Sequence, residues 1–491
     1  MKKLAWQALD AALGQGAQYA DVRFIEERHR SFSTKNGKLG HLSDSESTGL
    51  GIRVIADRAW GFAATDDTSQ EGMIGCARRA TAIARASARV NPQPAALAPE
   101  APVRAVWNSP CVVDPFTIPA QEPLELLYAV DREARSVAGV TLAETNMEFH
   151  RASQIFVSSE GAEIEQTRTT SGAGLSALAF AGNELQKRSY PNSFGGQHQL
   201  KGYELIAELR LLENARRVGE EAVALLKADP CPELTGTLIL DSSQLGLQIH
   251  ESIGHPIELD RVLGMEANFA GASFLTLEKL NHLRYGTSLV NVVADARLEH
   301  GPGLGTFGFD DEGVPAQCQD IIRAGEFTGY LMNRETALQI GQARSNGCMR
   351  AESWNRVPLI RMTNISLLPG EQPLSPEELI ADTDAGIYME TNRSWSIDDK
   401  RYNFQFGCEL GWEIRHGRKT RMLKNPSYSG ITTEFWNSLD AICSRPYWTL
   451  WGTPNCGKGQ PQQTMGTGHG AAPARFRKVR IGSAFRKAEA G

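Results

Sequence analysis

The residues of this chain with the most specific chemical potential are His250, Glu251 and His255, which stand in the order H-E-x-x-x-H. Two imidazoles can supply nitrogen ligands to a zinc ion, and a carboxylate beside the first can act as general base toward a metal-bound water. The usual zinc-protease motif, H-E-x-x-H, is one residue shorter. Positions five apart lie about 140° apart around a regular helix, so a straight helix would point the two histidines away from each other.

The residues around the second histidine favour a distorted helix end. Gly254 tolerates unusual backbone angles, and Pro256 cannot continue a helix interior and pushes His255 away from helical angles. We therefore predict a helix over residues 243–254, whose widened last turn or one-residue bulge swings His255 back toward His250. A strand within residues 231–241 leads into this helix, with Asp241 or Ser242 as the predicted cap.

A third metal ligand must come from elsewhere, because catalytic zinc usually takes three protein ligands and a water. Cys456 lies in the sequence P-N-C-G-K-G-Q, which predicts a glycine-flanked loop, and Lys458 beside it would favour the thiolate. His469, in G-T-G-H-G, is the rival candidate. The other acids and histidines considered have ion-pair, surface or hydrogen-bonded roles as their simpler interpretation: Glu258, Asp260, His282, His300 and His416.

Length and composition are those of a globular protein of two to four domains. The 491 residues are 41% hydrophobic and 22% charged, and the formal net charge of −6 argues against a nucleic-acid-binding protein with a basic face. No apolar run approaches the roughly 18 residues that a membrane span requires. The first ten residues suit an amphipathic helix better than a signal peptide. Eight cysteines without any C-x-x-C predict reduced thiols and a cytoplasmic protein. Together with the charge and the lack of a long apolar run, we expect partners that include neither a membrane nor nucleic acid.

The first half of the chain, residues 1–230, predicts an α+β domain in which a helix–β-meander–helix order occurs twice. A proline-rich connector over residues 91–123 separates the two halves. Its prolines predict an extended linker or a surface strap rather than an element of the core. The predicted helices are residues 2–14, 69–88, 123–136 and 203–227. The predicted strands are residues 19–27, 30–34, 49–55, 59–64, 141–150, 154–158, 163–170 and 173–181, with a hairpin turn at Ser159-Glu160-Gly161.

The second half, residues 231–491, predicts one β-rich catalytic domain that contains the H-E-x-x-x-H helix. Its candidate strands are residues 289–295, 365–368, 386–390, 402–406 and 409–415, the last followed by a turn at residues 416–418. Short helices are expected at residues 375–382, with Ser375 as cap, and at residues 432–441. The fold class is therefore α+β throughout, with strands dominating the second half.

Several sequence blocks, in order and spacing, resemble the TldD/PmbA family of zinc peptidases, in particular its metal-bearing TldD-like branch. The blocks span nearly the whole chain: residues 49–63 (GLGIRVIADRAWGFA), 250–256 (HESIGHP), 310–315 (DDEGVP), 361–364 (RMTN) and 456–460 (CGKGQ). The last block is one residue shorter than the usual form, and the basic residues Arg475, Arg477, Lys478 and Arg480 depart from the familiar pattern.

The resemblance implies one zinc ion per chain, held by His250, His255 and Cys456, with Glu251 as the catalytic residue. It also implies a homodimer, or a heterodimer with a family paralogue, that encloses a cavity and hydrolyses unfolded or short peptides. If substrate must enter a closed cavity, we expect it to bind as an extended strand paired with a sheet edge. Three alternatives remain open at this point: a non-catalytic partner subunit, a peptide-binding module with a structural zinc, and a hydrolase of another substrate.

Overall fold

The first sheet is built from two stretches of chain that each begin with a helix. The computed structural model describes residues 1–91, 93–269 and 271–483, and its first sheet has the strand order β3-β2-β1-β5-β6-β4, with β7 and β8 also paired to β6. The elements of this half are α1 (Lys2–Gly14), β1 (Tyr19–Lys35), β2 (Lys38–Ala56), β3 (Ala59–Thr65), α2 (Gln70–Ser87), β4 (Arg104–Asn108), α3 (Gln121–Arg135), β5 (Val140–Ser158), β6 (Glu163–Ala181), β7 (Glu184–Tyr190), β8 (Gln197–Gln199), α4 (Glu204–Glu208) and α5 (Leu211–Lys227). The predicted order of helix, β-meander and helix is found twice.

The strands of this sheet are longer than the sequence pattern indicates. The predicted pieces 19–27 and 30–34 form the single strand β1. In the same way, pieces 141–150 and 154–158 merge into β5, and pieces 163–170 and 173–181 merge into β6. Residues 38–48 were not predicted as strand, because they are polar and largely exposed on both faces, yet they pair with β1 over their whole length. Backbone pairing, rather than burial of alternate side chains, therefore extends this sheet.

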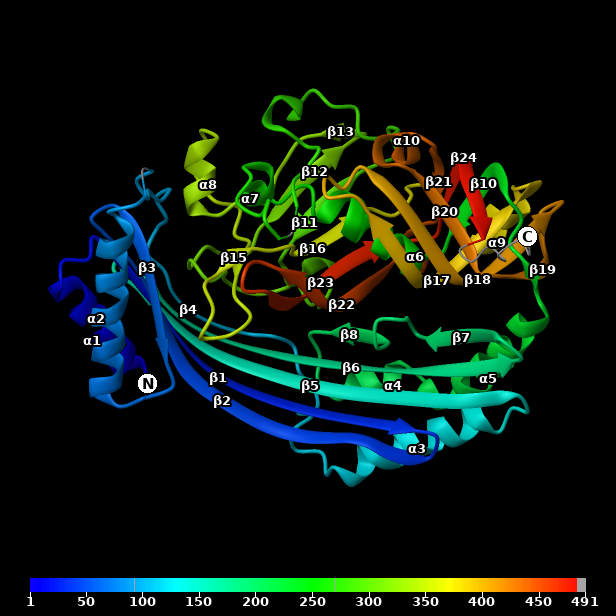
Figure 1. The fold of residues 1–491 in the computed structure, drawn as a ribbon, viewed down its shortest axis with the longest axis horizontal. Coiled ribbons are helices and arrows are strands. Elements are labelled where there is room, and N and C mark those ends of the chain that lie inside the picture. The colour runs from blue at the N-terminus through cyan, green and yellow to red at the C-terminus, as the bar shows by residue number, and fades with distance from the viewer. Residues whose placement is uncertain (92, 270, 484–491) are drawn as a thin grey trace.

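Helices cover different parts of the long strands (Figure 1). Helices α1 and α2 pack on β1, β2 and β3 at one end, whereas α3 and α5 pack on β5, β6 and β7 toward the other end. The prediction of one continuous helix over residues 203–227 is wrong, because the structure has two helices there. The segment breaks into α4 and α5 at Arg210, whose left-handed φ of 50° interrupts the helix without any glycine or proline to signal it.

The second half contains a closed barrel and a six-stranded sheet. The barrel follows the path β17-β10-β24-β20-β18 and is closed by pairing of β17 with β18, while β19, β9 and β21 extend it. The second sheet has the order β13-β12-β11-β16-β23-β22. The strands are β9 (Asp229–Pro230), β10 (Leu234–Leu240), β11 (Val292–Asp295), β12 (Cys318–Arg323), β13 (Glu326–Phe327), β14 (Met349–Arg350), β15 (Leu359–Ile360), β16 (Asn364–Leu367), β17 (Ala385–Ile397), β18 (Asn403–Arg415), β19 (Arg418–Lys424), β20 (Pro426–Ile431), β21 (Leu439–Ile442), β22 (Thr449–Lys458), β23 (Gln463–Ala471) and β24 (Ala474–Ser483).

Few helices interrupt these strands. They are α6 (Ser242–Ile249), a π-helical turn (His250–Gly254), α7 (Leu259–Val262), α8 (Arg334–Gln339), α9 (Pro376–Ala381) and α10 (Thr432–Trp436), with 3₁₀ turns at Leu277–Lys279, Leu298–His300 and Arg445–Tyr447. The capping box at Ser375 is present as predicted. The helix predicted over residues 432–441 ends early, at Trp436, because residues 439–442 pair with β24 as a strand. The basic residues near the C-terminus, Arg475 to Arg480, lie in β24.

The first sheet is fastened to the second half by buried ion pairs. Arg53 on β2 donates to both Asp21 on β1, at 2.6 Å, and Glu312, at 3.4 Å. Beside it, Nη1 of Arg23 lies 3.5 Å from Oδ2 of Asp311. All these side chains are almost fully buried. The 49–63 and 310–315 blocks of the sequence therefore meet here, in a cluster that joins the two halves of the chain.

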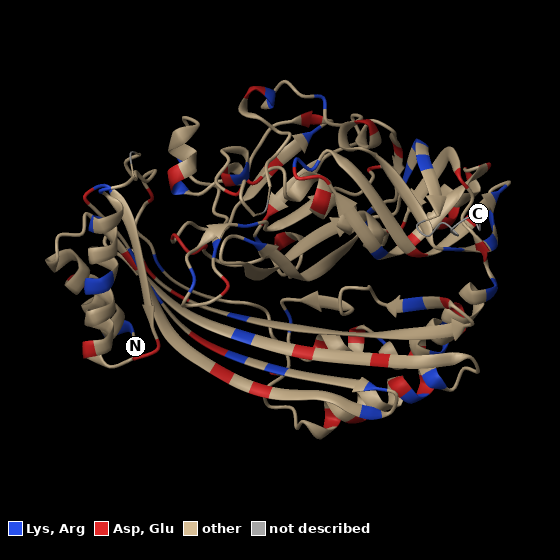
Figure 2. Cartoon of the chain, viewed as in Figure 1, with Lys and Arg blue, Asp and Glu red and all other residues tan. Residues whose placement is uncertain are grey.

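Elsewhere on the first sheet, charges of both signs are interspersed. Figure 2 shows acidic and basic residues mixed along the long strands, and pairs such as Arg28–Asp44 and Lys35–Glu144 join neighbouring strands. This distribution offers no face of a single sign to a highly charged partner. Across the described residues, no helix combines the length and the apolar character needed to cross a membrane.

We expect Arg53→Met to lower the free energy of unfolding by roughly 3–5 kcal/mol, because it leaves two buried carboxylates, Asp21 and Glu312, without their cation. Chemical denaturation would measure this change. Arg216→Met is the matched control, because the Arg216–Glu220 pair is exposed on α5 and its loss should cost less than about 1 kcal/mol. Equal shifts for the two variants would show that the buried cluster does not hold the halves together.

Candidate metal centre

A widened turn at the end of α6 brings the two motif histidines together. The N–H of His255 donates to the carbonyl of His250 at 3.1 Å, an i to i−5 bond, and residues 250–254 form a π-helical turn. The imidazole rings lie 4.8 Å apart between centroids. The extra residue in the motif is therefore absorbed by one wide turn, as the sequence predicted. Asp241 caps α6 by accepting from the N–H groups of Ser243 and Gln244.

Two details of this turn differ from the prediction. His255 keeps helical angles, φ −68° and ψ −44°, although a proline follows it. Gly254 matters less for unusual backbone angles than for space, because a Cβ at this position would lie 2.1 Å from the sulfur of Met362. The turn is held further by Ser252, whose carbonyl accepts from the Tyr285 hydroxyl and whose own hydroxyl accepts from the Trp436 indole at 3.0 Å.

Cys456 reaches the histidines from the edge of the six-stranded sheet. The predicted loop is wrong here, because Cys456 lies in β22 and pairs with Met465 of β23. A β-bulge between Thr453 and Cys456 places Pro454 and Asn455 opposite Gly466, and such a bulge re-aims the side chains that follow it. The proline and glycines that suggested a loop instead belong to this bulge and to the end of the strand.

The three side chains form a compact group of metal-ligating atoms. One donor atom from each of His250, His255 and Cys456 lies within 4.8 Å of the others, and all three residues are buried. The thiol sulfur of Cys456 lies 3.8 Å from Nε2 of His255. Tetrahedral zinc with ordinary bond lengths separates a sulfur and a nitrogen ligand by about 3.6 Å. The residues therefore fit a zinc ion with little movement.

His469, the rival third ligand, instead supports His250. Its Nε2 lies 2.7 Å from Nδ1 of His250, and its own Nδ1 lies 3.2 Å from the carbonyl oxygen of Ile365. Burial lowers the pKa of His469 well below the usual imidazole range, so this ring stays neutral. A neutral His469 that donates from Nδ1 must accept at Nε2. His250 then carries its proton on Nδ1 and keeps Nε2 free for a metal.

His255 is oriented in the same way by Glu258. Nδ1 of His255 lies 3.0 Å from a carboxylate oxygen of Glu258, which leaves Nε2 facing Cys456. Glu258 is fully buried, not a surface acid. Burial alone would raise its pKa, but the cations Lys458 and Arg261, together with His255, hold that pKa well below the usual range. Each histidine is thus fixed by a partner on the nitrogen that faces away from the metal position.

The electrostatics around Cys456 favour the thiolate, although not through the residue that the sequence indicated. Burial would raise the pKa of the Cys456 thiol, but Arg361 and His255 outweigh it and lower that pKa. Arg361 also donates to the carbonyl of Cys456 at 2.5 Å. Lys458 is engaged elsewhere, since its ammonium lies 2.8 Å from Asp260 and 3.4 Å from Glu258. Thiolate, rather than thiol, is the form that binds metal.

Glu251 faces an arginine from the barrel. Nη1 of Arg401 donates to the Glu251 carboxylate at 2.5 Å, and both side chains are largely buried. Arg401 lies in the hairpin between β17 and β18 with φ 64°, and its Nε has no hydrogen-bond partner among the described residues. A non-glycine residue in the left-handed region carries strain that the surrounding structure must hold. Here Asp398 does so by accepting from the N–H groups of Tyr402 and Asn403.

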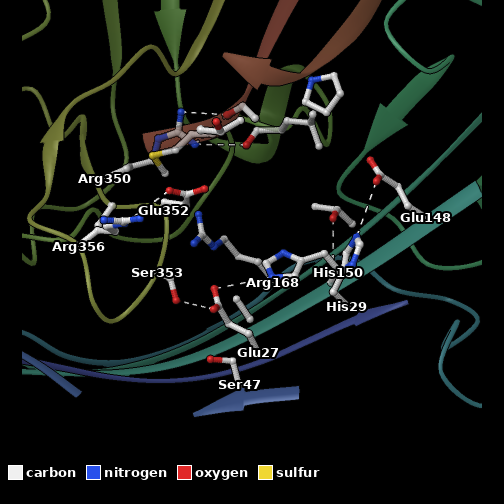
Figure 3. A pocket seen from close by; sticks show the side chains of 18 of the residues that line it. Glu27, His29, Ser47, Glu148, His150, Arg168, Arg350, Glu352, Ser353 and Arg356 are labelled. Atoms are coloured by element: carbon white, nitrogen blue, oxygen red, sulfur yellow. Dashed lines mark hydrogen bonds and ion pairs between the residues drawn. The ribbon is translucent and has the colours of Figure 1, made fainter. Parts of the chain in front are cut away.

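A cavity of about 580 Å³ opens between the first sheet and the strands next to Cys456 (Figure 3). Pro454 and Met465 form part of its wall, and Met465 is the strand partner of Cys456. Charged and histidine side chains of the first sheet form the opposite wall, among them Glu27, His150 and Arg168. The cavity therefore adjoins the pair of strands that carries Cys456.

The other histidines considered from the sequence lie apart from this group. His282 and His416 are exposed. His300 forms a second possible metal group with Asp295 and Cys318. In that group the Asp295 carboxylate already accepts from the Arg297 guanidinium at 3.0 and 3.1 Å, so a cation occupies the position beside it. Burial also raises the pKa of the Cys318 thiol to about 11, which disfavours the thiolate.

Comparison with known proteins places the chain in a family. Three family models match it: PmbA/TldA metallopeptidase domain 1 over residues 20–84, the central domain over residues 113–228, and the C-terminal domain over residues 235–483. The chain belongs to the PmbA/TldD family. The matches to the first and central domain models fall on the two stretches that build the first sheet, and the third covers the barrel and the six-stranded sheet.

Individual relatives of the family agree over most of their length. A metalloprotease of Methanothermobacter thermautotrophicus is 31% identical over 466 residues, which are 95% of each chain. A zinc metalloprotease TldD homolog of Saccharolobus solfataricus is 24% identical and covers 95% of this chain and 97% of its own. The crystal structure of a Thermotoga maritima protein superposes with a TM-score of 0.76 at 17% identity, covering 98% of this chain and 99% of that one, which supports the same fold.

The sequence did not indicate Arg361 or Arg401 as residues of the site, nor the supporting roles of His469 and Glu258. Arg361 stands in the R-M-T-N block, which marked the family resemblance without indicating a contact. Arg401 has no motif around it. Its hairpin, predicted only as a strand beginning near residue 402, gave no signal that the preceding residue would reach Glu251.

We expect Glu258→Gln to weaken zinc binding roughly 10–100-fold, because the amide removes the negative charge that fixes the His255 ring. Competition with a chromophoric chelator would measure the dissociation constant. Glu278→Gln serves as control, since Glu278 is exposed and distant in sequence from the group. An unchanged zinc affinity in Glu258→Gln would contradict the role assigned to this carboxylate.

Proposed function

We propose that this protein is a zinc-dependent peptidase that hydrolyses unfolded or short peptides. The observation that carries the proposal is the convergence of His250, His255 and Cys456 beside Glu251, with both imidazoles fixed in the tautomer that a metal requires. The names of the relatives, metalloprotease and zinc metalloprotease, support the same class of activity. Zinc, when bound, would supply a Lewis acid and a water of lowered pKa.

The protein residues divide the remaining work among themselves. Glu251 accepts the proton of the attacking water on its carboxylate and passes it to the leaving amine. Arg401 orients that carboxylate through a charge-assisted hydrogen bond. His469 and Glu258 hold the two imidazoles in place. A thiolate among the ligands donates charge, so we expect peptide cleavage to be slow and to depend on how well the substrate is positioned.

The geometry favours catalysis over a purely structural zinc. Structural sites are closed by four protein ligands, whereas catalytic sites leave one position for water. Among the described residues, the group around His250 contains three donors, not four. The presence of Glu251 beside His250 also argues against a non-catalytic partner subunit, which would have no use for a buried general base.

The cavity next to β22 supports a proposal for how the substrate binds. An extended peptide fits the cavity between the first sheet and β22, where recognition of the backbone would make side-chain preference loose. We expect the protein to work as a homodimer or as a heterodimer with a family paralogue, whose subunits enclose an internal cavity. The molecular mass of the purified protein in solution, measured with and without zinc, would identify this assembly.

Separate substitutions test the ligand set and the general base. Glu251→Gln should keep one zinc per chain and lose turnover by roughly 10²–10⁴-fold, because it removes the proton acceptor but no ligand. Cys456→Ala should lose zinc. Metal analysis of the purified proteins and mass mapping of peptide products measure both outcomes. Full peptidase activity in Glu251→Gln would contradict the assignment of Glu251 as general base.

Arg401→Gln should retain zinc and reduce kcat/KM roughly 10–100-fold, because the carboxylate of Glu251 loses the charged donor that orients it. Arg401→Lys should restore part of the loss, since an ammonium keeps the charge but not the geometry of the guanidinium. Arg418→Gln, at the exposed start of β19, is the control. If Arg401→Gln hydrolyses peptides with the same kcat/KM as the unaltered protein, Arg401 does not orient Glu251 for catalysis.

A further inference from the structure

One wall of the cavity is a set of cross-strand neighbours on the first sheet. Ser47 on β2 stands opposite Glu27 on β1, Glu27 opposite Ala152 on β5, and Ala152 opposite Arg168 on β6. All four line the cavity, because side chains opposite one another in paired strands point to the same face. Arg168 thus has an alanine as its neighbour on β5, which offers its guanidinium no partner.

The other charged groups of the cavity are already paired. Glu27 accepts from Ser353 at 2.5 Å and lies 3.7 Å from His150. Glu148 lies 2.9 Å from His198 and 3.7 Å from His29. On the opposite wall, Arg350 donates to the carbonyls of Gly466 and Met362. Arg356 lies 3.8 Å from Glu352.

Arg168 is the exception. Figure 3 shows its side chain extending from the sheet into the cavity, toward the wall that contains Arg350. It makes no hydrogen bond or ion pair with any residue of the part of the chain that the structure describes. Burial, followed by repulsion from Arg168 and Arg361, lowers the pKa of Arg350 to about 9. Two guanidinium groups therefore face this space, while the acids Glu27 and Glu352 that line the same cavity already hold other partners.

We propose that Arg168 binds a carboxylate of the peptide substrate and makes the enzyme select peptides that carry one. This inference rests on the proposed peptidase function and adds a substrate class to it. A guanidinium presents two parallel N–H donors that match a carboxylate, and the half-buried position strengthens such a pair relative to one in bulk water. The carboxylate would come either from the free C-terminus of the peptide or from an aspartate or glutamate side chain.

The test measures binding rather than turnover and uses zinc-loaded protein with Glu251→Gln, which holds peptides without cleaving them. A seven-residue peptide of alanine and glycine with an uncharged N-terminal fluorophore is made in three forms. These are the free C-terminal acid, the C-terminal amide, and the amide with one interior glutamate. Fluorescence anisotropy gives the dissociation constant of each form.

We expect at least one carboxylate form to bind roughly tenfold tighter than the neutral amide, as a charge-assisted hydrogen bond provides. Which form gains identifies the source of the carboxylate. Arg168→Gln should abolish the difference without weakening the neutral amide, and Arg168→Lys should keep part of it. Arg356→Gln should preserve the difference, because that arginine already has Glu352 as partner. Thermal unfolding checks that each variant is folded.

The inference is overturned if the neutral amide binds as tightly as both carboxylate forms, or if the preference survives Arg168→Gln or is lost equally in Arg356→Gln. Cleavage of the same peptides by protein with Glu251 intact separates this failure from a failure of the proposed function. Cleavage without carboxylate preference rejects the role of Arg168 alone. Absence of both binding and cleavage for all three peptides rejects the peptidase function and this inference with it.

Discussion

The metal-ligating group depends on one hydrogen bond, from the N–H of His255 to the carbonyl of His250. A regular α-helix would pair that N–H with residue 251 and rotate the second imidazole away from the first. Spacing the bond over five residues puts both rings on one side of the turn. The wide turn is stabilised from outside as well, by Tyr285 and Trp436 on Ser252, and the Met362 sulfur occupies the space that a Cβ at position 254 would need.

Around this turn, two sheets supply complementary parts. The six-stranded sheet provides Cys456 on β22 and His469 on β23, whereas the barrel provides Arg401 from the hairpin between β17 and β18. Helix α6 packs between β17 and β23, so the turn at its end meets both. Two of the three candidate metal ligands and the candidate general base thus come from one short segment, and Glu258, which orients His255, follows close behind. Cys456, and the side chains that orient His250 and Glu251, come from distant parts of the chain. This arrangement keeps the reacting groups on rigid elements.

Local sequence was sufficient for some of these features and insufficient for others. The H-E-x-x-x-H spacing and the residues that follow it predicted a widened turn, because a π-turn is determined by neighbours within one segment. The sequence also indicated the α+β class and the repeated helix–meander–helix order. It did not reveal that β22 is a strand, because a proline and two glycines in ten residues usually mark a loop, and only pairing with β23 overrides them. Nor could it connect Arg401 to Glu251, since that contact spans 150 residues.

Strand β22 lies at the edge of its sheet. Residues from the other half of the chain cover part of the side that has no neighbouring strand. Gln197, on β8, accepts from the N–H of Gly452 at 2.9 Å and donates to the carbonyl of Leu450 at 2.9 Å, and Gln199 reaches the same carbonyl. Unpaired edges invite association with other strands, and covering them prevents it. Side chains of β8 on the first sheet therefore cover the edge of β22 at residues 450–452. Separated from the first half of the chain, the second half would expose this edge of the strand that contains Cys456.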